Sequence, residues 1–172
     1  MRKTTPIIIL SGLLALTILP AGAGAEGQRK CESFSVTGPF STAITEFADI
    51  DANGKASTGD KQLGQIRLHN DKDDQMGERS WVMTVLDLAD DGSLKSAFTE
   101  SISSFYDGAI YTVTKVRDMP ANSFEDGQLA IEWSEYTSPI IGGTGAYAGA
   151  RGTVTAVLGD GKIDYSFDLE CD

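Results

Sequence analysis

Hydrophobic and polar residues alternate along most of this chain, and the alternation is cleanest in its last stretch, 163–171. The residues on one face of that stretch are Ile163, Tyr165, Phe167, Leu169 and Cys171, and acidic or hydroxyl side chains occupy the other face. A period of two is the pattern of a β-strand that buries one face and exposes the other. The stretch is therefore predicted to be a strand with an apolar inner face.

Seven further stretches show strand chemistry and are separated by turn residues. They are Cys31–Thr37, Leu63–His69, Trp81–Leu88, Leu94–Tyr106, Ala109–Arg117, Gln128–Thr137 and Arg151–Leu158. About eight strands without clear helical periodicity predict an all-β fold with little helix, either a sandwich or a single closed antiparallel barrel. An eight-stranded barrel has an interior that side chains fill or that holds one small ligand.

A glycine-rich run, Gly142–Gly152, connects two of these strands. It approaches the dinucleotide-binding fingerprint, but that motif requires a helix directly after the glycines. The strand-forming residues Thr153–Val157 follow instead, and the sequence has no Gly-Lys-Ser/Thr motif. The run is therefore interpreted as a tight Gly-Thr-Gly turn followed by a kinked strand, because glycine permits such backbone geometry.

The pattern Gly142-Gly143-Thr144-Gly145-x-Tyr147-x-x-Ala150-Arg151-Gly152 resembles the C-terminal signature of the allene oxide cyclase and dirigent-like β-barrel families. The resemblance covers Ile140–Leu169 and extends more weakly from Gly59 onward. It implies that residues 26–172 form an eight-stranded antiparallel barrel with a ligand-sized interior and no organic cofactor. A homo-trimer is implied by the same analogy. One family cyclises a fatty-acid epoxide and the other steers a coupling reaction, so the resemblance selects no single reaction.

Residues 1–25 have the features of a secretory signal peptide. Arg2 and Lys3 precede an apolar run, Pro6–Leu19, and small residues follow at Ala23-Gly24-Ala25. The alternative is a retained membrane anchor, but the apolar run is too short to span a bilayer. We therefore expect a secreted or periplasmic protein without membrane contact after the signal is removed.

The net charge of −11 disfavours binding to nucleic acid and to anionic membrane surfaces. It suits a cationic partner or divalent cations, and it also serves solubility. The two cysteines, Cys31 and Cys171, stand near the two ends of the exported segment. In an exported protein such a pair is most simply a disulfide, which would hold the first and last strands together. Two free thiols or a redox couple are the alternatives.

The segment Asp49–Asp60 has the spacing of a calcium-binding loop. Its candidate oxygen ligands are Asp49, Asp51, Asn53, Ser57 and Asp60, and Gly54 stands where such loops turn sharply. Asp60 replaces the usual glutamate, and Gly59 interrupts the helix that normally follows. A polar turn leading into a strand explains the same residues, so both interpretations stay open.

Polar residues on apolar strand faces are the candidates for chemistry in a small barrel. Glu100 lies between Phe98 and Ile102 in the alternation, and Glu135 continues an apolar face. A carboxylate among apolar groups has a raised pKa and can act as a general acid or base or stabilise a cation. Arg151 matches the arginine that the resemblance places in the cavity, although its neighbours in the alternation face the other way.

Aromatic side chains are the candidates for walls of a ligand cavity. They are Tyr106, Tyr111, Trp133, Tyr147 and Tyr165. Three functions follow as hypotheses. The first is an exported barrel that binds a hydrophobic small molecule and steers its cyclisation or isomerisation. The second is a non-catalytic binding module, and the third is a structural barrel that calcium stabilises.

Overall fold

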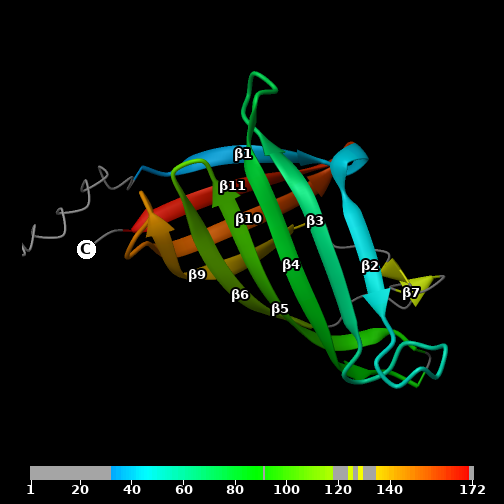
Figure 1. Cartoon of the computed structure of the whole chain (residues 1–172). Coiled ribbons are helices and arrows are strands. Elements are labelled where there is room, and N and C mark those ends of the chain that lie inside the picture. Colours follow the sequence, from blue (N-terminus) through cyan, green and yellow to red (C-terminus); the bar gives the residue numbers. More distant parts are fainter. Residues whose placement is uncertain (1–31, 91, 118–123, 126–127, 130–134, 171–172) are drawn as a thin grey trace, which may run out of the picture.

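The computed structural model, drawn in Figure 1, describes residues 32–90, 92–117, 124–125, 128–129 and 135–170. The predicted signal peptide, Cys31, Cys171 and Trp133 lie outside these residues, so export and the disulfide stay predictions. Among the described residues, no helix is long and apolar enough to cross a membrane.

Strands make up almost all of the regular structure in the described part of the chain. The elements are β1 Phe34–Pro39, the 3-10 helix η1 Phe40–Thr42, β2 Ile44–Ala48, β3 Lys61–His69, β4 Gln75–Leu88, β5 Leu94–Phe105, β6 Gly108–Arg117, β7 Phe124–Glu125, β8 Gln128–Leu129, β9 Glu135–Gly145, β10 Arg151–Gly159 and β11 Lys162–Glu170. The two short strands β7 and β8 pair only with each other.

Eight strands close into an antiparallel barrel in the order β1-β11-β10-β9-β6-β5-β4-β3. The ring is completed where Thr37 of β1 pairs with His69 of β3. The other end of β3 pairs with β2, which is an additional strand outside the ring. Figure 1 shows the ring with β3 to β6 in front of β1, β10 and β11. The predicted all-β fold and closed barrel of about eight strands are confirmed.

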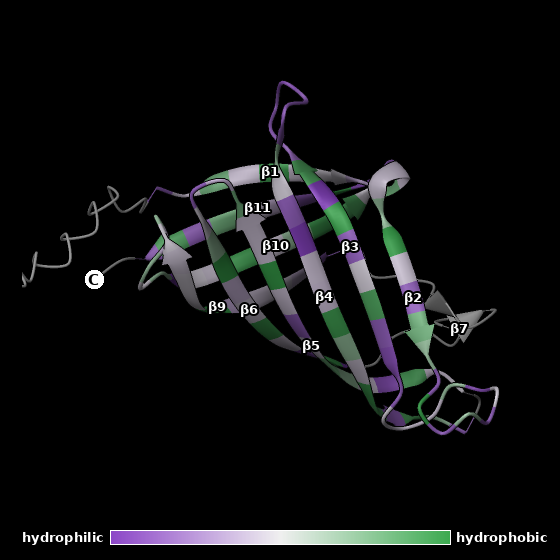
Figure 2. Cartoon of the chain, in the orientation of Figure 1, coloured by the Kyte–Doolittle hydropathy of each residue, from purple (hydrophilic) through white to green (hydrophobic). Residues whose placement is uncertain are grey.

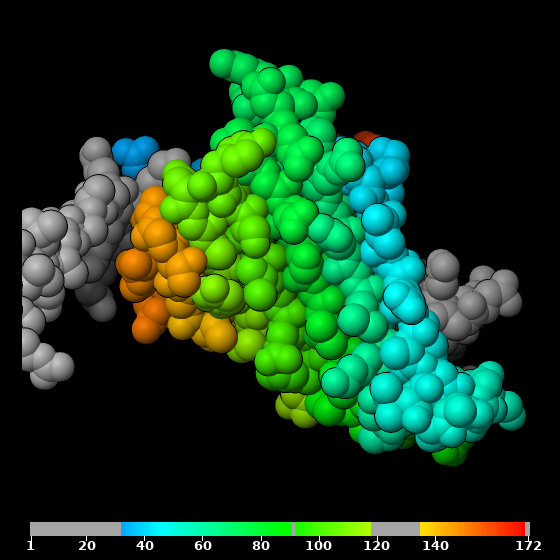
Figure 3. Space-filling view, viewed as in Figure 1, coloured from blue at the N-terminus to red at the C-terminus, as the bar shows by residue number. Residues whose placement is uncertain are grey.

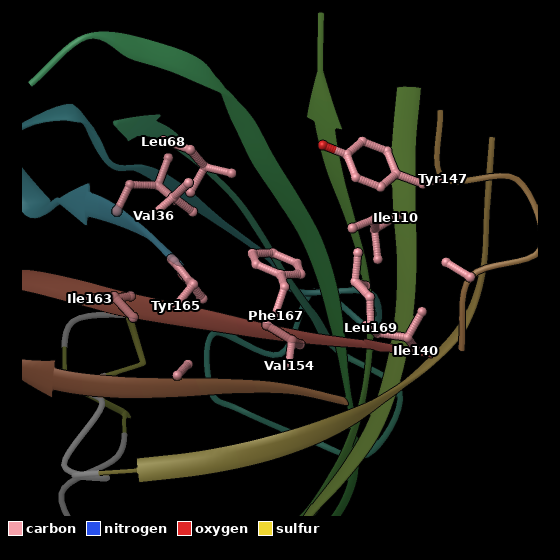
Figure 4. Packing of buried hydrophobic residues seen from close by; sticks show 13 residues of the cluster. Val36, Leu68, Ile110, Ile140, Tyr147, Val154, Ile163, Tyr165, Phe167 and Leu169 are labelled. Carbon is pink, nitrogen blue, oxygen red and sulfur yellow. The ribbon is translucent and has the colours of Figure 1, made fainter. Parts of the chain in front are cut away.

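The main hydrophobic core fills one part of the barrel interior, and Figure 4 shows thirteen of its residues. Strand β11 contributes Ile163, Tyr165, Phe167 and Leu169, which are all buried, so the predicted inner face of this strand is confirmed. The aromatic ring of Phe167 stacks on that of Phe34 across the β1–β11 pair, with ring centroids 4.8 Å apart. Figure 2 shows the alternation of polar and apolar residues along the strands.

Strand β4 begins earlier than the sequence pattern indicates. The sequence pattern predicts a strand from Trp81, but β4 already begins at Gln75. The reason is a compact turn in which the side-chain oxygen of Asn70 accepts bonds from the backbone N–H groups of Lys72 and Asp74, each at 2.9 Å. Because β4 begins at Gln75, Arg79 lies within the strand, and four residues of β4 precede it.

The glycine-rich run is strand over its first half, which corrects the predicted Gly-Thr-Gly turn. Residues Gly142–Gly145 continue β9 and pair with β6, and the turn comes only afterwards, at 146–149. Gly143 is required because a Cβ there would approach the carbonyl oxygen of Ala109 to 2.8 Å and collide with the turn at Tyr147. The predicted kink is present at Gly152, whose φ is +113°.

Candidate functional site

The middle of strand β5 turns two serines into the barrel and two large apolar residues outward. Ser101 and Ser103 are buried, whereas Phe98 and Ile102 are 37% and 42% exposed. A register irregularity between β4 and β5 beside Leu94 explains the change of side, because Leu94 and Ala97 are both buried although three positions apart. Counting in twos from Leu94 therefore assigns the wrong face to the rest of the strand.

A buried arginine, Arg79 of β4, lies opposite these serines and is 1% exposed. Its Nη1 donates a hydrogen bond to Ser103 Oγ at 2.7 Å, and its Nη2 donates to Thr112 Oγ1 of β6 at 3.0 Å. Its guanidinium carbon also lies 5.2 Å from the centre of the Tyr165 ring, which is within the range of a cation–π interaction. The side chain is thus fixed by three strands and presents a positive charge inside an apolar barrel.

Other small polar side chains share the inner face of the sheet with this arginine. Ser101 and Thr112 face each other across β5 and β6, and Ser138 of β9 is buried on the same inner surface. The interior therefore has a polar layer, made by Arg79 and hydroxyl groups. Trp81 and Tyr136 pack against the core beside it and are only half-buried.

The phenol of Tyr165 stays neutral in this layer. Burial raises its pKa well above its usual range, and Tyr136 acts in the same direction. Arg79 acts in the opposite direction but does not overcome burial. Tyr165 therefore offers Arg79 an aromatic face and no negative charge, and the predicted placement of Tyr165 inside the barrel is correct.

The three residues predicted to be catalytic lie on the outside of the barrel. Glu100 and Glu135 are exposed, so the expectation that they face the interior is wrong. Arg151 is also exposed, and its Nη1 donates to the carbonyl oxygen of the preceding Ala150 at 2.8 Å. The kink at Gly152 leaves Arg151 on the outer face, so none of the three can contact a ligand held inside.

The predicted aromatic wall is only partly inside. Tyr106 is 85% exposed, and Tyr111 is half-buried on the outer face of β6. Tyr147 is buried but belongs to the aromatic cluster with Phe34 and Phe105. Trp81 and Arg79 are interior residues that the sequence analysis missed. Their shared parity with the buried Met83 and Val85 is a signal that could have found them.

An open groove of about 580 Å³ lies on the outer face of β2 to β6. The residues of that face that line it are Ile44, Glu46, Leu63, Gln65, Ser80, Val82, Glu100, Ile102, Tyr111, Val113 and Ile141, and Gly64, Trp81, Ser101 and Thr112 of the inner face also border it. Most are apolar, and Ile44 and Ile141 are 70% and 51% exposed. Figure 3 views the molecule from the side of these strands. An apolar patch on an outer sheet face marks an interaction surface.

The acidic loop brings three of its predicted ligands together. Carboxylate oxygens of Asp49, Asp51 and Asp60 lie within 4.8 Å of one another. Asp60 is fully buried and accepts bonds from the backbone N–H groups of Ile50 and Ser57 at 2.8 and 2.7 Å. A bond from the Gly54 N–H is the largest cause that lowers the pKa of Asp49. These bonds also fit a polar turn, so calcium binding stays a prediction.

A small antiparallel barrel with a polar interior layer is thus the class that fold and site define. No protein-family model and no curated protein matches the sequence. Solved structures do match, among them a pyocyanin demethylase, with a TM-score of 0.61 and 16% identity over 81% of this chain and 100% of that one.

Two further solved structures share the barrel. A pterocarpan synthase dirigent protein aligns with a TM-score of 0.54 and 14% identity over 81% of this chain and 94% of that chain. A heme-binding cyclase that catalyses a [4 + 2] cycloaddition aligns with a TM-score of 0.54 and 13% identity over 83% and 65% of the two chains. At these identities the likeness establishes the fold, which agrees with the barrel that the glycine-rich signature implied.

Proposed function

We propose that this protein is an exported barrel that binds a hydrophobic small molecule in its interior and steers the cyclisation or isomerisation of that molecule. The observation that carries the proposal is the polar layer around Arg79, because a buried cation with hydroxyl partners is costly for a purely structural core. Support comes from the dirigent protein and the cycloaddition cyclase, which share the barrel.

The chemistry that this interior supports is positioning together with polarisation. Arg79 and the hydroxyls of Ser101, Thr112 and Ser138 can stabilise negative charge that develops on an oxygen, while aromatic and aliphatic walls hold the reacting chain in a folded conformation. Among the described residues, no buried carboxylate faces this layer; the buried Asp60 belongs to the acidic loop. General acid–base catalysis by Glu100 or Glu135 is therefore not part of the proposal.

The experiment is native mass spectrometry of the exported protein together with whatever co-purifies with it. We expect an added mass in the wild-type protein that disappears in Ser138→Phe, which fills the interior, because Ser138 is 2% exposed and faces inward. Ser166→Phe adds the same ring to the exposed face of β11 and should retain the ligand. Circular dichroism checks that both variants fold. Equal binding by the two variants would contradict an interior site.

The apolar outer groove supports a second proposal, that copies of this chain associate through β2 to β6 into the homo-trimer that the resemblance implies. Exposed aliphatic residues such as Ile102 and Ile44 would become buried in the contact. Sedimentation equilibrium measures the mass in solution. We expect Ile102→Lys to shift the protein to monomer and Ser166→Lys, on the exposed face of β11, to leave it unchanged. A monomeric wild-type protein would refute this proposal.

A further inference from the structure

The charge on Arg79 has no anionic partner among the residues that the structure describes. Their ion pairs are His69 with Asp73 and Lys162 with Asp164, both away from the interior layer. The chain has 25 acidic residues against 14 lysines and arginines, so the lack of a carboxylate beside Arg79 does not reflect a shortage of them. A buried guanidinium normally keeps an anion beside it, since an isolated buried charge is strongly unfavourable.

The guanidinium of Arg79 has more N–H donors than the two hydrogen bonds described above use. It carries five N–H groups, and the hydroxyls of Ser103 and Thr112 accept one bond from each terminal nitrogen. Both hydroxyls are neutral, so they orient the planar group without compensating its charge. Tyr165 cannot compensate it either, because its phenol stays protonated. The described protein groups therefore leave the charge of Arg79 uncompensated.

The surroundings define the shape of such a partner. The Tyr165 ring lies beside the guanidinium, and the indole of Trp81 covers Gly64, where any Cβ would collide with it. Trp81 and Tyr136 are half-buried, and the small buried side chains of Ser101 and Ser138 lie on the same inner face. Flat aromatic walls favour a flat, conjugated ligand through stacking and apolar contact.

We infer that the interior site takes a planar, conjugated molecule through an anionic oxygen, of carboxylate, phenolate or enolate type, that accepts hydrogen bonds from Arg79. This inference rests on the proposed interior binding function. Ser103 and Thr112 act as positioning residues, because they hold the guanidinium fork in one orientation. Selectivity for the anion over a neutral molecule of the same shape then comes from one residue.

The test compares 2-naphthoate with 2-naphthamide, which has the same ring and a neutral head group, by isothermal titration calorimetry of the exported protein. We expect naphthoate to bind at least roughly tenfold more tightly, the effect of a charge-assisted hydrogen bond. Arg79→Gln should remove that preference and leave the affinity for naphthamide unchanged. Arg67→Gln, which removes a charge from the exposed face of β3, should have no effect.

A second pair of variants covers the case in which Arg79→Gln does not fold. Arg79→Lys keeps the charge but loses the planar fork, and Ser103→Ala frees the guanidinium from one holding bond. Both should reduce the preference for naphthoate several-fold. Equal affinity of the wild-type protein for the two probes would overturn the inference while leaving interior binding intact. Binding of neither probe would overturn the inference for this ligand class, and loss of co-purified ligand on filling the interior tests the proposed function separately.

Discussion

The substitution Phe167→Ala tests whether the aromatic cluster in the barrel interior is the main source of stability. Phe167 is 1% exposed, stacks on Phe34 at 4.8 Å and meets the edge of Phe105 at 5.9 Å. Removing a buried phenylalanine ring costs about 3–5 kcal/mol, which combines lost transfer free energy and the cavity that remains. The aromatic pairs lie within the spacing at which ring geometry adds to area burial, so we expect the upper half of that range.

Such a loss is large for a domain whose total stability is about 5–15 kcal/mol. Urea unfolding followed by circular dichroism measures it, provided that the slope of the transition stays unchanged. Phe98→Ala is the matched control, because Phe98 is 37% exposed on the outer face of β5 and should cost at most about 1.5 kcal/mol. If the two variants lose equal stability, or Phe167→Ala loses less than about 1 kcal/mol, the assignment of inside and outside is wrong.

Three further predictions concern the backbone, pH and calcium. Gly152→Ala should cost about 2–4 kcal/mol in urea unfolding, since φ is +113° and a Cβ would collide with the carbonyl oxygen of Asp168, whereas Gly159→Ala should be neutral in the same assay. Burial is the largest single effect on Asp164 and opposes its ionisation, but the Thr37 hydroxyl and the Lys162 ammonium together outweigh it, so the pKa is lowered from 3.8. The carboxylate therefore stabilises the fold at neutral pH and loses this effect as the pH falls through its lowered pKa. The difference in Tm between wild type and Asp164→Asn should vanish there, and a difference that persists at lower pH contradicts the assignment. Addition of about 10 mM calcium should raise the Tm if the acidic loop binds it with the affinity of extracellular sites; an unchanged Tm in chelator and in calcium removes the ion.

The closed barrel was predictable from sequence because its strands carry their own signals. Strand β11 alternates without interruption from Ile163 to Leu169, so its inner face could be assigned by counting. The same count assigns the wrong inner face to most of strand β5, because the register of β5 against β4 shifts beside Leu94. Glu100 was placed inside on the strength of its apolar neighbours, yet those neighbours, Phe98 and Ile102, are themselves on the outer surface. Alternation with a period of two shows which residues share a face of the strand. It does not show which of the two faces lies inside the barrel.

The interior arginine was missed for a related reason. Arg79 lies in the charged segment between the predicted strands Leu63–His69 and Trp81–Leu88, and a charged segment between two strands suggests exposure to solvent. Its parity with Trp81, Met83 and Val85 was available but became meaningful only once β4 was known to begin at Gln75. The local turn at Asn70 decides that start, and its side-chain bonds depend on three-dimensional geometry that no periodicity records.

In the middle of β5, serines lie inside the barrel and large apolar residues lie outside. Both placements have the same structural origin. Across β4, β5 and β6, residues that pair side by side share a face, so placing Ser101 and Ser103 inside necessarily places Glu100 and Ile102 outside. One choice of face therefore creates both the polar layer around Arg79 and the apolar groove on the outer surface. The opposite choice would bury Ile102, but it would also bury Glu100 and expose Met83, Val85 and Ile110, so the apolar residues of β4 and β6 decide which face of β5 lies inside. The polar layer and the apolar outer groove therefore follow from one assignment of faces, and the interior ligand and the partner chain proposed for them are tested separately above.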